Sequence, residues 1–322
     1  MKRVIKSIVV LLLILGGLYI IVVQPVFQTQ PANIAVRVTP NALQDHVKML
    51  SETNPARKGD INLNITASYI KRQLERSQGK FGKVSETEFQ VDGKTFRNVS
   101  LLLGDGSKPR IVVGAHYDSF EGFPGADDNA SGVAVLLEVS KLLTDRDNKN
   151  DIELIAYSQE EPPSFGSENM GSYLHAKQLE DNKIPVILML SLEMLGYFSD
   201  DNGSQGYPAP GMNLIYPEKG NFIALISDLH SMLKLRRAKR HMQSAIDFPA
   251  LSMSVPGFLF NADWSDHRWF WQKGFAAIMI TDTAFYRNQA YHTENDTMER
   301  LNFEKMAKVA DGVHQIIIAF DD

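Results

Sequence analysis

The first feature of the hydropathy pattern is an apolar run over residues 7–23, which is 17 residues long and contains no charged residue. It follows Lys2, Arg3 and Lys6, and the next charged residue is Arg37. A run of this length lies at the lower end of the roughly 17 to 25 residues that cross a bilayer. Residues 19–27 lack the small-x-small cleavage site of a signal peptide. We therefore expect an uncleaved single-pass membrane anchor with its cations in the cytoplasm.

Beyond a polar linker, the pattern predicts helices over 41–52 and 65–77, and then a hairpin over 81–104 that turns at Asp92-Gly93. Residues 110–115 (RIVVGA) form a short apolar run, which is typical of a strand buried on both faces. A helix over 130–143 and a second buried strand over 151–158 follow. This order of strand, helix and strand indicates a parallel sheet covered by helices.

The same alternation continues to the end of the chain. It predicts helices over 166–179, 220–233 and 303–320 and strands over 185–192 and 276–281. Residues 200–261 are rich in Gly, Pro, Asn and Met and weak in strand pattern, so we interpret them as an insertion or a lid. The expected fold is a three-layer α/β/α domain over 41–322 with a mixed, mostly parallel sheet, joined by a linker over 28–40 to the anchor at 1–27.

Composition narrows the chemistry. The 322 residues contain no cysteine, so any metal is bound through nitrogen and oxygen and a cysteine nucleophile is excluded. The formal charge is only -5, and no run of Lys and Arg is interleaved with aromatic residues. We therefore expect no nucleic-acid partner.

Acidic and histidine residues recur where the predicted strands end, which is where open α/β sheets bind ligands. His116 and Asp118 follow the first buried strand, and Asp118 can orient the imidazole of a metal-binding His116. A histidine in a surface turn would give the same sequence pattern. Asp127 and Asp128 precede a helix among glycines. They fit either a helix N-cap or a carboxylate that bridges two cations.

Three further acids and one histidine complete this set. Glu160 and Glu161 are held at a strand end by Pro162-Pro163, and a buried pair of carboxylates requires a metal or a proton between them. Glu193 follows another buried strand, and His292 lies in the loop before the last helix.

A count of these ligands gives three per metal. His116 and Glu193 complete one site, Glu161 and His292 complete the other, and Asp127 is shared between them. Three protein ligands leave room for a bridging water, as in catalytic zinc sites. The oxygen and nitrogen donors suit zinc, with cobalt or manganese as substitutes.

With these residues assembled, the segments GAHYDS, PGADDNASG, QEEPP, LEMLGY, SDH and YHTENDT resemble the co-catalytic two-zinc exopeptidases of clan MH, over residues 98–312. This family includes bacterial leucyl aminopeptidases, glutamate carboxypeptidase II and glutaminyl cyclase. The resemblance implies the same five ligands, with Glu160 as general base and Asp118 as the partner of His116. It also implies a cis bond between Asp127 and Asp128.

One departure is Glu193, where the best-known aminopeptidases carry Asp. By the same resemblance, Asp266 and His267 are structural or support the ligands from behind. Arg287 either pairs with a substrate carboxylate or braces its loop.

The implied activity is the removal of N-terminal residues from peptides outside the cytoplasm, on the periplasmic or extracellular side. The alternatives are a glutaminyl cyclase with one zinc, a carboxypeptidase acting on small peptides, and a peptidase-fold protein that only binds. The oligomeric state stays open.

Overall fold

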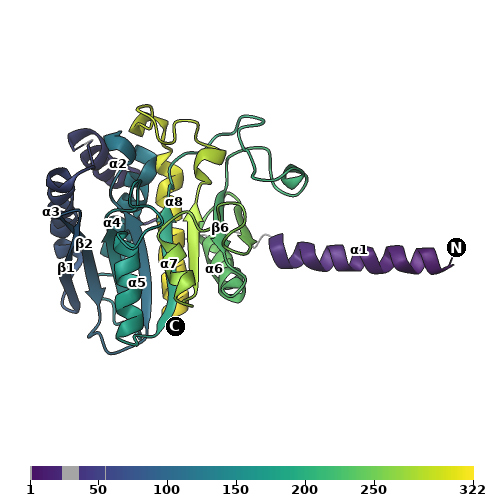
Figure 1. Cartoon of the computed structure of the whole chain (residues 1–322), viewed down its shortest axis with the longest axis horizontal. Helices are drawn as coiled ribbons and strands as arrows, with labels where there is room; N and C mark the ends of the chain where they lie inside the picture. Colours follow the sequence, from purple (N-terminus) through teal and green to yellow (C-terminus); the bar gives the residue numbers. More distant parts are fainter. Residues whose placement is uncertain (1, 24–35, 55) are drawn as a thin grey trace.

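The elements form one eight-stranded sheet between two layers of helices (Figure 1). The structure is a computed structural model that describes residues 2–23, 36–54 and 56–322. The strands are β1 (Gly82–Val91), β2 (Lys94–Leu103), β3 (Arg110–His116), β4 (Asp151–Tyr157), β5 (Val186–Glu193), β6 (Ile223–Ser227), β7 (Ala250–Ser254) and β8 (Ala277–Thr281). The helices are α1 (Lys2–Val23), α2 (Pro40–Lys48), α3 (Asp60–Ser77), α4 (Gly132–Leu142), α5 (Gly171–Asp181), α6 (Met232–Ala245), α7 (His267–Gln272) and α8 (Phe303–Asp321).

The order of strands in the sheet is β1-β2-β4-β3-β5-β8-β6-β7. The central strands β4, β3, β5 and β8 run parallel to one another. Strand β2 is antiparallel to β4, and β6 is antiparallel to β8. The carboxyl ends of the four central strands therefore meet at one edge of the sheet, where open α/β sheets bind their ligands.

Side chains of the central strand β3 alternate between two apolar cores. Ile111 and Val113 pack into the larger core, on the face covered by α2, α3, α4, α6 and α8. Val112 packs with Phe270 of α7 in the smaller core on the opposite face, which α5 and α7 cover. Burial of each such side chain contributes about 1.5 to 3 kcal/mol. Both faces of β3 are covered, which explains its uninterrupted apolar run.

Most of the predicted elements are confirmed, including the hairpin, whose turn residues Asp92 and Gly93 both have positive φ. The helix predicted over 220–233 is wrong, because residues 223–227 are strand β6 and the helix begins only at Met232. A short apolar run such as FIALIS fits a strand and a helix equally well, and pairing with β8 decides between them. Residues 200–261 are thus not a simple insertion, since 223–254 supply two strands and a helix of the main fold.

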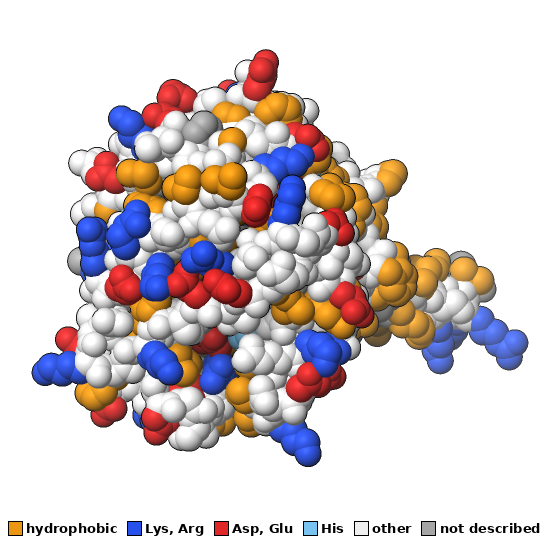
Figure 2. Space-filling model, turned by 60° about the vertical axis from the view of Figure 1, so that its left-hand side comes forward, with side chains coloured by type: hydrophobic (Ala, Val, Ile, Leu, Met, Phe, Trp, Pro, Cys, Tyr) orange, Lys and Arg blue, Asp and Glu red, His pale blue; other side chains and the backbone are white. Residues whose placement is uncertain are grey.

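Residues 2–23 are helical, and Val4 to Leu15 expose 49–71% of each large apolar side chain. Figure 2 shows these apolar side chains along α1 with Lys and Arg at its outer end, whereas charges of both signs are mixed over the domain surface in view. Among the residues that the structure describes, no helix has the combined length and apolarity that a membrane crossing requires. Residue 1 of the expected anchor, its end at 24–27 and most of the linker lie outside the described residues.

Candidate metal centre and active site

The carboxyl edge of the sheet gathers most of the predicted site residues. His116 is the last residue of β3 and Glu193 the last residue of β5, and His116 Nε2 lies 3.4 Å from Glu193 Oε2. Asp118 Oδ1 lies 3.5 Å from the other ring nitrogen, Nδ1, so it is placed to orient the imidazole. Ser265 donates a 2.6 Å hydrogen bond to Glu193 Oε2 and fixes that carboxylate in turn.

Asp128 lies between the two histidines. Its Oδ1 is 3.4 Å from His116 Nε2 and its Oδ2 is 3.2 Å from His292 Nε2. Donor atoms of His116, Asp128 and Glu161 lie within 4.8 Å of one another, close enough to hold a metal ion. A carboxylate with one oxygen directed to each histidine has the geometry of a bridging ligand.

The structure thus corrects the assignment of Asp127. Its Oδ1 accepts a hydrogen bond from Gly196 N and its Oδ2 accepts one from Asn288 Nδ2, each at 2.9 Å. Burial and the neighbouring Asp282 raise the pKa of Asp127 well above its usual value. The cis bond is likewise displaced by one residue, to Asp128-Asn129. Two adjacent aspartates point in different directions, and the sequence does not show which one faces the histidines.

Glu160 and Glu161 follow β4 and diverge as expected. Their backbone amides both donate to the Asp118 carboxylate, at 3.2 and 2.9 Å, which holds the pair in place. Glu161 Oε2 lies 3.2 Å from His292 Nε2, whereas Glu160 Oε2 is 3.9 Å from His116 Nε2. Glu161 therefore stands at a ligand position, and Glu160 stands beside the histidines and acids.

The ring of His292 is held by stacking. Phe120 lies against one side, with ring centroids 4.0 Å apart and planes inclined by 4°. Tyr291 also stacks on it, at 3.7 Å and 16°. The His292 side chain is 21% exposed, whereas that of His116 is only 1% exposed.

The electrostatics of the cluster suit a bound cation. Burial and the charge of Asp128 raise the pKa of Glu161 to about 8. Burial opposes the charged form of His292, but Asp128 and Glu161 raise its pKa to about 9. Glu161 Oε1 and His292 Nε2 are buried and make no hydrogen bond. An excess of carboxylates, together with buried donor atoms that lack a hydrogen-bond partner, fits a group of metal ligands.

The three remaining predicted residues differ in position. The carboxyl of Asp266 is buried. Burial raises its pKa to about 7, although the charge of His116 and the Ser172 hydroxyl limit the rise. His267 lies 2.7 Å from the carbonyl of Ala262, and burial lowers its pKa to about 4, so it is a neutral structural residue.

Arg287 braces the chain and does not face a substrate. It is 2% exposed, and it donates to the carbonyls of Tyr197 and Phe222 and to Gln205 Oε1. The suggestion that it binds a substrate carboxylate is therefore not supported, because the side chain is buried and its Nε and Nη1 donors bind groups within the protein.

Several supporting residues were missed by the sequence interpretation. Asp296 accepts hydrogen bonds from the backbone amides of Asp127 and Asp128 at 3.0–3.2 Å. Asn288 holds Asp127, and the buried Arg57 contacts the same loop from the N-terminal side. The segment NDT around Asp296 lies within the motif that resembles the family, whereas nothing near Arg57 marks it as part of the site.

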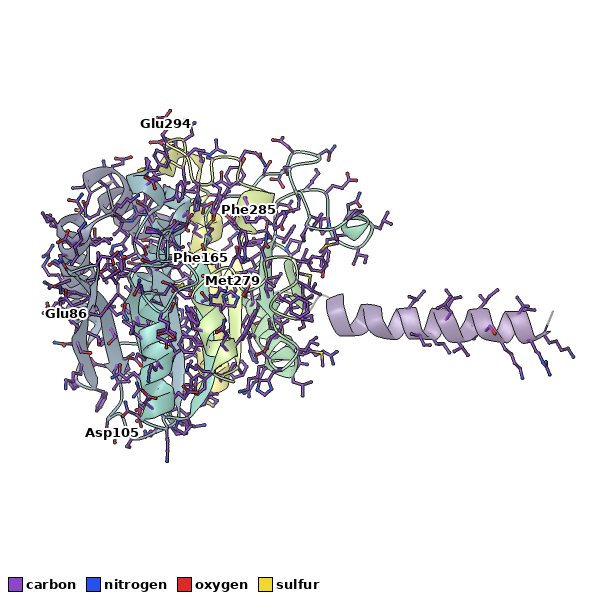
Figure 3. All side chains as sticks on the ribbon, in the orientation of Figure 1. Glu86, Asp105, Phe165, Met279, Phe285 and Glu294 are labelled. Carbon is purple, nitrogen blue, oxygen red and sulfur yellow. The ribbon has the colours of Figure 1, made fainter. Side chains whose placement is uncertain are left out.

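A cavity of about 900 Å³, including its open mouth, adjoins Glu193. Its wall is formed by β6, β7 and β8 and by aromatic side chains, among them Phe260, Trp264 and Tyr291. Met279 and Phe285, which line it from β8 and residues 284–286, are labelled in Figure 3. Glu193 is the one charged residue among the described residues that line the cavity. The cavity is therefore an apolar pocket with Glu193 at one wall.

An α/β fold with a mixed sheet, two histidines and a group of carboxylates beside an apolar pocket is typical of metal-dependent hydrolases. The sequence matches the model described as peptidase family M28 over residues 98–317. It is 41% identical to an uncharacterised Escherichia coli (strain K12) protein, YfbL, over 97% of this chain and 98% of that protein. The chain therefore belongs to peptidase family M28 and is a metallo-exopeptidase.

Two more distant proteins are also similar, one in sequence and one in fold. A probable leucine aminopeptidase of Trichophyton verrucosum is 26% identical, over 92% of this chain and 80% of that protein. The crystal structure of BSAP, a zinc aminopeptidase from Bacillus subtilis, has a similar fold, with a TM-score of 0.69 and 15% identity over 88% of this chain and 96% of that one.

Proposed function

We propose that this protein is a zinc-dependent aminopeptidase that holds two zinc ions with His116, Asp128, Glu161, Glu193 and His292. The observation that carries the proposal is the position of Asp128, which directs one oxygen to each histidine at 3.4 and 3.2 Å. His116 and Glu193 would complete one site, and His292 and Glu161 the other. The nitrogen and oxygen donors fit zinc, and cobalt or manganese would fit the same ligands.

Glu160 is the proposed general base. When bound, the zinc ions supply Lewis-acid polarisation of the scissile carbonyl and lower the pKa of water. Glu160 accepts the proton of the attacking water and then delivers it to the leaving amine. Burial raises the pKa of Glu160 well above its usual value, and the charge of His116 opposes that rise. A carboxyl with a raised pKa is suited to hold a proton between these two steps.

The pocket indicates the substrate class. Aromatic and aliphatic side chains cover its walls, so it favours a large apolar N-terminal side chain over a charged one. Glu193 lies at its wall, so a substrate side chain in the pocket would place the N-terminal residue next to the proposed metal-binding residues. We expect activity on leucyl, methionyl and phenylalanyl substrates and weak activity on lysyl or glutamyl ones.

The decisive variant is Glu160→Gln. We expect kcat to fall by about 10³-fold or more, within the 10²–10⁴-fold range of general acid–base catalysis, while the zinc content stays unchanged. Glu168→Gln, an exposed glutamate in the same loop, is the control and should keep both. Full activity of Glu160→Gln would refute the assignment.

A substrate panel separates the related activities. An aminopeptidase releases a free amino acid and stops when the α-amine is acetylated. Release of ammonia with ring closure from an N-terminal glutamine peptide would instead identify a cyclase. Cleavage that depends on a free substrate carboxylate would identify a carboxypeptidase, and a chain that binds peptides without cleaving them would be a binding protein.

We also propose that residues 1–27 attach the domain to a membrane and place it on the periplasmic or extracellular side. Support comes from the apolar run at 7–23, the three preceding cations and the exposed apolar side chains of α1. The full chain should then enter the membrane fraction and resist extraction by salt, whereas a chain without residues 1–27 should be released. Equal release of both would contradict the attachment.

A further inference from the structure

Arg57 is a fully buried cation next to the metal centre. It lies between α2 and α3, outside the segment that matches the peptidase family, and its exposed fraction is 0%. A buried guanidinium is costly unless each of its donors has a partner. Its contacts therefore show what the charge does in this fold.

All five N–H donors of Arg57 have carbonyl acceptors. Nε donates to Tyr117 O at 2.9 Å, and Nη1 donates to Leu50 O and Pro124 O, both at 2.8 Å. Nη2 donates to Gly125 O at 2.7 Å and to Asp128 O at 3.3 Å. A lysine, with three donors on one atom, cannot reproduce this planar set of five.

Four of the five acceptors belong to the two loops that present metal-binding side chains. Tyr117 directly follows His116, and Pro124, Gly125 and Asp128 form the turn that aims the Asp128 carboxylate. The carbonyl of Arg57 itself accepts from Ser119 N at 2.9 Å. One residue thus joins the His116 loop to the Asp128 loop.

Gly125 shows that the turn fits closely around the guanidinium. Its φ is +55°, and a Cβ at this position would lie 2.8 Å from Arg57 Nη2 and closer still to Asp128 O. Glycine lacks the side chain that would obstruct this approach.

The charge of Arg57 also opposes that of the acidic cluster. The acids that act on it most are Asp128, Asp296, Asp118 and Glu161. Burial lowers its pKa, but only to about 10, so it stays positive at neutral pH. The guanidinium therefore combines fixed geometry with a permanent charge beside the carboxylates.

We propose that Arg57 is the positioning residue that fixes Asp128 for bridging the two metals, an inference that rests on the proposed function. It acts through the loop and touches neither metal nor substrate. Asp128 would thus be held in part by a residue that lies outside the segment that matches the family model.

The test compares Arg57→Lys with Arg110→Lys. Arg110 is also buried and paired, with Glu153 at 2.7 Å, but it lies at the opposite end of β3 from His116. We expect Arg57→Lys to lower zinc affinity by about 10- to 100-fold, measured by chelator competition, as for other supporting residues of metal sites. The value of kcat should fall similarly, with KM within about twofold. Arg110→Lys should lower Tm and keep the affinity for zinc.

Gly125→Ala is the second variant, for the case that Arg57→Lys does not fold. It keeps the cation but pushes the turn away from it, so it should also weaken zinc binding. Unchanged zinc affinity in whichever of the two variants folds would overturn the proposal. An equal loss in Arg110→Lys would do so too, because general destabilisation would then suffice. If the unaltered chain binds no zinc or cleaves no peptide, the proposed function fails instead.

Discussion

The two halves of the proposed metal centre are built differently. His116 and Glu193, in the first half, are the last residues of two buried strands. Ser265 donates a hydrogen bond to Glu193, and the Asp118 carboxylate lies beside the His116 ring. The half with His292 and Glu161 lies on loops, and His292 is 21% exposed and held by two stacked rings. Ligands on strands are held more rigidly than ligands on loops. On the proposed function, the first half should bind zinc tightly and the second should exchange it faster.

The largest expected difference is between His116→Ala and His292→Ala. His116→Ala should lose most bound zinc and reduce kcat/KM by about 10⁴-fold, which corresponds to several kcal/mol of lost metal assistance. His292→Ala should keep one zinc per chain and lose about 10²-fold. Zinc content after desalting, together with kcat/KM, measures both. Equal loss of zinc in the two variants would remove the distinction between the halves.

Burial opposes the charged form of His116, but Glu193 and Glu160 raise its pKa well above the usual value, so zinc binding should release protons at both halves. His292 has a pKa of about 9 without metal, so a proton must leave before zinc binds. Affinity at the His292 half should rise about 100-fold per pH unit below about pH 8, where Glu161 and His292 both lose a proton, and about tenfold per unit from there to about pH 9. Competition titrations between pH 6.5 and 8.5 measure this rise. A flat profile would show that His292 does not give up a proton.

The same pKa shifts set the stability of the metal-free protein. The folded pKa of His292 exceeds its ordinary value of 6.5, so its stabilising effect is complete below pH 6.5 and is lost as the pH rises through about 9. Glu161, raised from 4.5 to about 8, acts in the same direction over its own range. Thermal melts without zinc should therefore show Tm falling from pH 6.5 to 9, and added zinc should remove the trend.

Ser265→Ala tests the support of the tight half. It removes the 2.6 Å hydrogen bond to Glu193, and loss of such a support costs about 10- to 100-fold in metal affinity. In a chelator experiment, release of the slow zinc should accelerate while the fast phase is unchanged. Acceleration of the fast phase alone would place Glu193 in the other half.

Phe120→Ala should have the smallest effect. A stacked aromatic pair is worth about 0.5 to 1.5 kcal/mol, so its loss corresponds to a roughly 2- to 10-fold faster release of the exchangeable zinc. Phe120→Tyr, which keeps the ring, is the matched control and should release zinc at the original rate. If Phe120→Ala leaves both phases unchanged, stacking does not hold His292.

The sequence by itself determined the alternation of elements, the buried central strands and the clustering of acids and histidines at their carboxyl ends. Uninterrupted apolar runs, period-two alternation and a glycine in a tight turn are local signals, so β3 and the hairpin could be predicted from short segments. Local patterns left two matters undecided. The run FIALIS became strand β6 because β8 offered it a partner, and the segment that contains it was mistaken for an insertion.

Only the tertiary structure decided which of the two adjacent aspartates faces the histidines. Asp127 is turned toward Gly196, Asn288 and Asp282, which leaves Asp128 for His116 and His292. The supporting roles of Arg57 and Arg287 were also visible only in the tertiary structure. Both donate to backbone carbonyls that are distant along the chain, such as those of Asp128 and Phe222. A side chain's direction depends on partners that only folding brings near, and residue type and spacing do not encode them.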